Sequence, residues 1–126
     1  MAMEKITNAY FNKLDWHDAI IDKITIDRSC PGVIDIIDIH IIWKDETKNT
    51  LHFENVYWAD LNMNFGVVAA ESILKAISKG RDCIPVIECY NKWKDNIDNI
   101  NLNYYEIETN STGSTIRIIA EWLSIT

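Results

Sequence analysis

The segment Val33–Lys44 reads Val-Ile-Asp-Ile-Ile-Asp-Ile-His-Ile-Ile-Trp-Lys, and it predicts the central strand of a β-sheet. Isoleucine and valine are restricted at χ1 and pack well on a pleated surface, so a segment this rich in them favours a strand over a helix. Side chains alternate between the two faces of a strand. One face is nearly all apolar and is expected to meet the core: Val33, Asp35, Ile37, Ile39, Ile41 and Trp43. The opposite face is mixed and carries Asp38 and His40 near its middle.

Four further strands are predicted around this one. Ala19–Asp27 reaches it through a turn that contains Pro31 and Gly32, which predicts an antiparallel hairpin. The other three predicted strands are Leu51–Trp58, Leu102–Thr109 and Ser114–Ser124, the last two forming a second hairpin around an Asn-Ser-Thr-Gly turn. Ala59–Gly66 mixes polar and large apolar residues without a period and is predicted to be a loop.

The principal helix is predicted over Val67–Lys79. Its apolar residues recur at helical spacing, at Val67, Ala70, Leu74 and Ile77. Asn64 is expected to cap its start and Gly80 to end it. A short helix is predicted over Glu4–Leu14.

The stretch Cys83–Lys94 fits either an edge strand or an irregular helical turn, because Pro85 disfavours both a helix interior and a central strand. Lys94–Asn101 is polar and is predicted to be a loop. Together the patterns predict a single α+β domain over residues 1–126. Its antiparallel sheet would have five or six strands, with one principal helix packed on one face.

Composition excludes several classes of function. The chain has 126 residues and a net charge of −7, so a phosphate backbone would repel it and nucleic acid is a poor partner, whereas a basic protein is a plausible one. No apolar run is long enough to span a bilayer and no secretory signal is visible, so neither membrane attachment nor export is expected. Three cysteines without a Cys-x-x-Cys spacing favour reduced thiols in the cytoplasm.

No nucleotide fingerprint and no nucleophile elbow occur in the sequence, so a catalytic site and a cofactor are not predicted. The alternative to a binding domain is a small metal- or ligand-binding domain or an enzyme that uses pairs of histidine and carboxylate. Two such pairs have two-residue spacing on predicted strands, which puts both members on one face: Asp38 with His40, and His52 with Glu54. The simpler interpretation is a solvated polar face of an antiparallel sheet.

The five tryptophans are numerous for a domain of this size. Tryptophan fills cores and is also enriched at interaction hot spots. Core filling is predicted for Trp43 and Trp122. Trp58 begins a segment that also holds Asp60, Met63 and Phe65, and these four residues are the predicted protein-binding interface.

The opening Leu14-Asp15-Trp16-His17-Asp18-Ala19-x-Ile, the third strand with Leu51-His52-Phe53 and the late hairpin resemble a pattern in small bacterial proteins. Some of those proteins are grouped with the immunity proteins of polymorphic toxin systems. The resemblance implies a non-enzymatic protein that binds and blocks a cognate toxin, and it supplies no catalytic residues.

Overall fold

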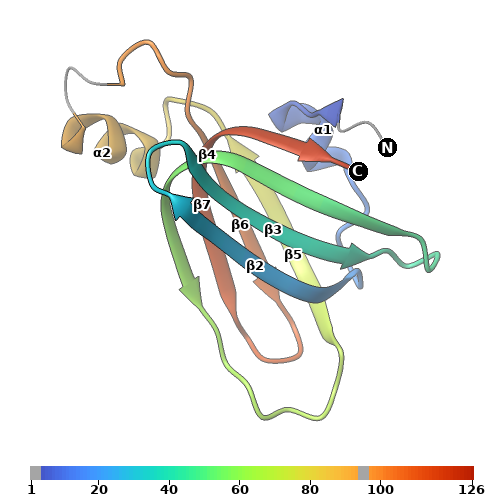
Figure 1. Ribbon diagram of the computed structural model, residues 1–126. Helices are drawn as coiled ribbons and strands as arrows, with labels where there is room; N and C mark the ends of the chain where they lie inside the picture. The colour runs from blue at the N-terminus through green and yellow to red at the C-terminus, as the bar shows by residue number, and fades with distance from the viewer. Residues whose placement is uncertain (1–3, 94–96) are drawn as a thin grey trace.

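A computed structural model describes residues 4–93 and 97–126 of the chain. These residues form seven strands and two short helices (Figure 1). In chain order they are β1 (Glu4–Lys5), α1 (Asn8–Lys13), β2 (Ile20–Cys30), β3 (Ile34–Ile42), β4 (Lys48–Asn62), β5 (Glu71–Lys79), α2 (Ile84–Lys92), β6 (Asn103–Thr109) and β7 (Thr115–Ile125). The α+β composition and the antiparallel sheet are confirmed, with more strands than expected. No helix in the described part of the chain is long and apolar enough to cross a membrane.

All strand pairs are antiparallel, and the sheet closes on itself. The order is β1-β7-β4-β3-β2-β5-β6, and β6 also pairs with β7. β7 is shared by three neighbours: β4 lies along one side, while β6 and then β1 lie along the other. The junction between β2 and β5 closes the ring through only two paired positions, Ile20 with Ser72 and Ile21 with Glu71.

The main core lies inside the closed sheet. The predicted inner face of β3 is confirmed at Ile37, Ile39 and Ile41, which are buried, whereas Val33 precedes the strand and is 81% exposed. The three isoleucines pack with side chains from β2, β4, β5, β6 and β7, among them Phe53, Ile73, Tyr105, Ile107, Ile116, Ile118 and Leu123. The two predicted hairpins are confirmed as β2–β3 and β6–β7.

Helix α1 is shorter than the predicted Glu4–Leu14 helix, and it covers the edge of β5. Thr7 caps its first turn through a hydrogen bond from the Tyr10 amide. Phe11 points into the core, where its ring lies 4.6 Å from that of Trp16. Asn12 accepts a hydrogen bond from the Ser78 amide at 2.7 Å and donates to the Ser78 carbonyl at 3.0 Å. The side chain of one residue thus replaces a missing strand neighbour of β5.

The predicted principal helix over Val67–Lys79 is wrong. Residues 71–79 form β5, which pairs with β6, and the residues before it form a connection. A register shift between Ile73 and Lys75 breaks the strand's alternation, and Leu74 and Ile77 are left exposed on the outer face. The apolar spacing therefore imitates a helix.

Three further expectations around β4 and β5 are wrong. β4 continues to Asn62, so the predicted loop over Ala59–Gly66 is a strand in its first half. The Asn64 side chain caps no helix and donates to the Thr112 carbonyl. Gly80 ends a strand rather than a helix.

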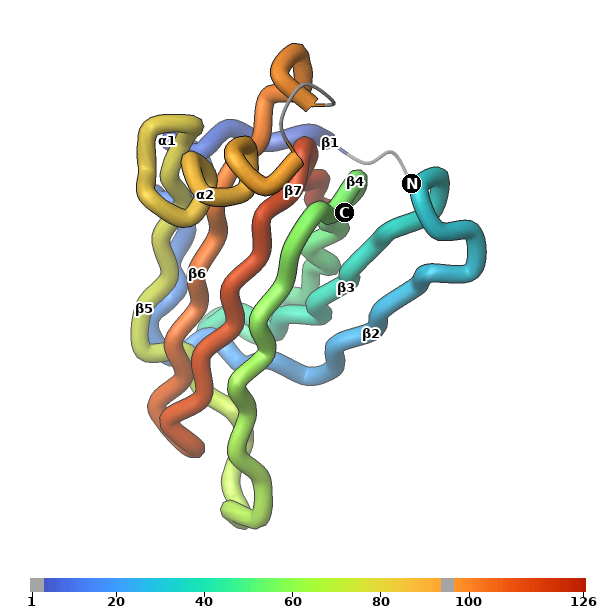
Figure 2. The backbone as a smooth tube through the Cα atoms, turned by 90° about the vertical axis from the view of Figure 1, so that its left-hand side faces the viewer, coloured from blue at the N-terminus to red at the C-terminus, as the bar shows by residue number. Residues whose placement is uncertain are grey.

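Within the ambiguous stretch Cys83–Lys94, residues Ile84–Lys92 form helix α2, with Pro85 in its first turn, where a missing N–H is tolerated. It covers the outer face of the sheet, over β6 and β7 (Figure 2). Val86 and Cys89 form a second apolar cluster there with Tyr104 and Ile119. The predicted loop Lys94–Asn101 lies outside the described residues as far as residue 96.

Candidate functional site

Two partly exposed tryptophans converge on the outer face of the molecule, where α2 lies over the sheet. Trp58 belongs to β4 and is 38% exposed, and Trp93 follows α2 and is 42% exposed. Both line a pocket of about 330 Å³ together with Tyr57, Pro85, Glu88, Cys89, Lys92, Tyr104, Arg117 and Ile119. Both also line an adjoining open groove of about 610 Å³ toward the β2–β3 turn. We call the surface around Trp58 and Trp93 the two-tryptophan surface.

Irregularities in β4 aim Trp58 outward. Strict alternation would put Val56 and Trp58 on the same face. The register with β7 shifts between these two residues, so Val56 packs on the inner core and Trp58 faces α2. One residue earlier, Asn55 has a positive φ of 54° and donates a hydrogen bond to the Glu121 carboxylate at 2.7 Å. Bulges of this kind re-aim side chains, and they commonly occur next to functional sites.

The polar residues beside Trp58 carry an excess of negative charge. Arg117 of β7 lies 3.4 Å from Glu106 and 3.9 Å from Asp60, so one guanidinium faces two carboxylates. The Glu106 carboxylate also accepts a hydrogen bond from Tyr104 at 2.5 Å. Burial, and secondarily the bond to Glu106, raise the pKa of the Tyr104 hydroxyl, which therefore stays a donor. Asp60 is left with the longer contact, and its side chain is 47% exposed.

The four predicted interface residues divide between two places. Trp58 and Asp60 share the outer face of β4 at the two-tryptophan surface, opposite Ile119 and Arg117 of β7. Met63 and Phe65 instead line an open apolar groove of about 550 Å³ beside β2. Phe65 is 83% exposed there, whereas Met63 packs partly against the core.

The histidine–carboxylate pairs lie on the outer faces of β3 and β4, where the predicted pair of His52 with Glu54 is brought together and the predicted pair of Asp38 with His40 is not. His52 is held from both sides, with Nδ1 2.5 Å from Asp38 across the strands and Nε2 3.3 Å from Glu54. His40 contacts Thr50 through Nδ1 at 3.0 Å rather than Asp38. Both ring nitrogens of His52 already face a carboxylate. Among the described residues, no group of three or more histidine, cysteine, aspartate or glutamate side chains is arranged to hold a metal ion.

Sequence reasoning missed Trp93 and Arg117 as members of the site. Trp93 follows a helix whose existence was ambiguous, and Arg117 reaches Asp60 only through the β4–β7 pairing. The tryptophan expectations were partly right: Trp43 packs against the core, with its ring 5.2 Å from that of Trp16. Trp122 is 40% exposed and carries Lys5 over its ring at 3.7 Å, so its predicted core role is wrong.

A scan against protein-family models gives no match for this chain, and a search of curated proteins gives none either. Inference about function therefore rests on the geometry of the two-tryptophan surface.

Proposed function

We propose that this protein is a non-enzymatic protein-binding domain that blocks a basic partner protein, in the manner of the immunity proteins of polymorphic toxin systems. The observation that carries the proposal is the pairing of Trp58 with Trp93 around a concave surface. Binding hot spots are enriched in tryptophan and arginine, and a polar rim usually surrounds their apolar centre. Here the rim consists of Asp60, Glu88, Lys92 and Arg117.

The charge of the site supports a basic partner. Glu88 and Lys92 balance each other formally, whereas Arg117 is shared between Glu106 and Asp60. A lysine or arginine of the partner can therefore pair with Asp60. The net charge of −7 steers such a partner toward this protein from a distance.

We assign this activity to the cytoplasm. Cys30, Cys83 and Cys89 are all free thiols, and Cys30 is exposed. Exposed free thiols suit a reducing compartment, whereas oxidising compartments favour disulfides.

The test measures, by isothermal titration calorimetry, binding to the C-terminal domain of the protein encoded directly upstream. Wild type should bind, and Trp58→Ala should lose about tenfold or more in affinity because a hot-spot anchor is removed. Asp60→Lys should also weaken binding, because it replaces the half-exposed carboxylate with a charge that repels a basic partner.

Trp122→Ala is the matched control. Trp122 is about as exposed as Trp58 but lies near β1, where Lys5 covers its ring. Its removal should leave affinity unchanged. Absence of wild-type binding would count against the function, whereas equal losses for the two tryptophan variants would count against the assigned surface.

A further inference from the structure

The outer edge of β2 is open along most of its length. On one side β2 pairs with β3 from Ile20 to Cys30. On the other side its pairing with β5 ends at Ile21. Beyond that point, in the part of the chain that the structure describes, no strand lies beside it (Figures 1 and 2). In an antiparallel ladder alternate residues turn both backbone groups away from their partner, so this edge presents unpaired N–H and C=O groups.

The sequence along the open edge is complementary to itself when read backwards. It runs Asp22-Lys23-Ile24-Thr25-Ile26-Asp27-Arg28. If a second copy pairs antiparallel with Thr25 opposite Thr25, then Lys23 faces Asp27 and Ile24 faces Ile26, in both directions. Asp22 and Arg28 face each other at the two ends. Opposite charges and apolar pairs directly across two strands are stabilising.

The regular stretch of the β2 backbone is centred on the same residue as this charge pattern. The β2–β3 register runs without a break from Lys23 to Asp27, and shifts occur on either side of that segment. The regular part of the edge is therefore five residues long and centred on Thr25. Charged side chains on an edge strand usually hinder its association with another edge. An edge whose charges have opposite signs at symmetric positions attracts a second copy instead.

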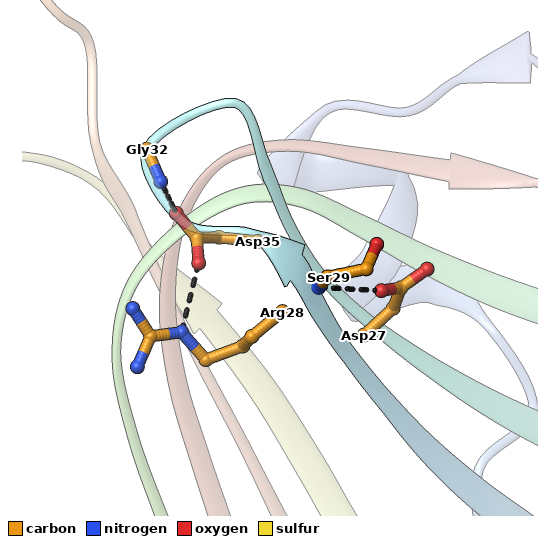
Figure 3. A network of polar contacts seen from close by, with 5 residues as sticks. All are labelled: Asp27, Arg28, Ser29, Gly32 and Asp35. Atoms are coloured by element: carbon orange, nitrogen blue, oxygen red, sulfur yellow. Dashed lines mark hydrogen bonds and ion pairs between the residues drawn. The ribbon is translucent and has the colours of Figure 1, made fainter.

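The side chains on the two faces of the β2 edge suit pairing with a second copy. Ile24 and Ile26 line the apolar groove that also holds Phe65. Asp27 and Arg28 project to opposite sides of the strand, as Figure 3 shows. Arg28 is held by Asp35, whose carboxylate accepts from its Nε at 2.9 Å and from the Gly32 amide at 2.8 Å. The turn is thus fixed, and the outer nitrogens of the guanidinium remain available to Asp22 of another copy.

We propose that two copies of this chain associate through antiparallel β2–β2 pairing across a two-fold axis at Thr25. Each copy's backbone groups would complete the other's open edge. The paired Ile24 and Ile26 side chains would cover the apolar groove beside Phe65. A two-fold interface uses the same patch on both partners, which the self-complementary sequence satisfies.

A cysteine at the symmetry axis tests the geometry. In a Cys30→Ser background, Thr25→Cys places two thiols directly opposite each other, where the Cα separation of about 4.5–5.5 Å allows a disulfide. With oxidised glutathione, this variant should give a covalent dimer on non-reducing electrophoresis. Asp27→Cys is the matched control, because its two copies would lie about 13 Å apart along the strands and should not crosslink.

Sedimentation equilibrium of the wild type and of charge-exchange variants tests the register of the proposed β2–β2 pairing. The wild type should dimerise from 14.6 kDa protomers. Lys23→Asp and Asp27→Lys each create two like-charge pairs per dimer and should weaken dimerisation roughly tenfold or more. The double variant restores opposite charges in both pairs and should recover the dimer. Lys79→Asp, on an exposed position of β5, should leave dimerisation unchanged.

The proposal is overturned if the wild type sediments as one chain at every concentration, or if Thr25→Cys crosslinks no better than Asp27→Cys. It is also overturned if the double exchange stays as weak as the single variants. Circular dichroism of each variant confirms that the fold is retained. These measurements need no other protein, so their outcome is independent of the proposed binding of a basic partner.

Discussion

Single side chains stand in for missing backbone partners in this fold, and Asn12 is the clearest example. It satisfies both the amide and the carbonyl of Ser78, a buried residue at the edge of β5 that helix α1 covers. Asn12→Leu should lower the free energy of unfolding by about 1–3 kcal/mol, because both groups lose their partner while helix α1 remains possible. Urea denaturation measures the change. Lys13→Leu, the neighbouring exposed position on the same helix, should change stability little, and an equal loss there would refute the explanation.

Tyr105 makes the free energy of unfolding depend on pH in the alkaline range. Its ring lies in the core, 5.0 Å from Phe53 and 5.4 Å from Phe11, and burial raises the pKa of its hydroxyl above the ordinary value of 10.0. The folded state therefore keeps a proton that the unfolded chain releases near pH 10, so the free energy of unfolding falls as pH rises above that value. Tyr105→Phe should flatten this decline in denaturation curves. An unchanged slope would show that other groups control it.

Of the four candidate residues that the sequence grouped together, the structure keeps two on one surface. Trp58 and Asp60 were predicted as an interface and share one surface in the structure. Phe65 and Met63 were predicted with them and lie at a different groove. Strict alternation counts residues along one strand, and it cannot show the register shift in β4 that turns Trp58 toward α2.

At the scale of elements, the irregular part of β4 includes Asn55. Its left-handed backbone is costly for most residues and is tolerated better by asparagine, and its amide also holds Glu121. Asn55→Ala should destabilise the protein by about 1–3 kcal/mol, because it keeps the backbone strain and loses the hydrogen bond.

Asn55→Gly separates the two contributions. Glycine relieves the strain but also loses the hydrogen bond, so this variant should be less destabilised than Asn55→Ala. Thermal unfolding monitored by circular dichroism gives the order. A glycine variant less stable than the alanine variant would show that strain at Asn55 is unimportant.

The elements themselves differed in how well the sequence predicted them. β3 and the β6–β7 hairpin were predictable because dense β-branched residues and a Gly-containing turn act locally. β5 was not, because its alanine, leucine, glutamate and lysine favour helix in isolation. Pairing with β6 overrides that preference. The two exposed apolar residues, Leu74 and Ile77, supplied the misleading helical spacing.

At the scale of the whole molecule, net charge should control the rate of association with the proposed basic partner. Raising the salt concentration should lower the association rate constant, because screening removes long-range attraction. Trp58→Ala should mainly raise the dissociation rate constant, since it removes a short-range contact. Surface plasmon resonance separates the two constants. An association rate that is independent of salt would contradict electrostatic steering by the charge of −7.

The position of β7 in the sheet also determines when the ring of strands can close during synthesis. The strands before it form two local sets, β2-β3-β4 and β5-β6, and β7 joins them by pairing with β4 and β6 and then with β1 near the beginning of the chain. Glu4 pairs with Ile125, the pairing with the largest separation in sequence among the described strands. Pairings this remote in sequence slow folding. On the ribosome the ring of strands stays open, with its apolar interior accessible to chaperones, until β7 has left the exit tunnel.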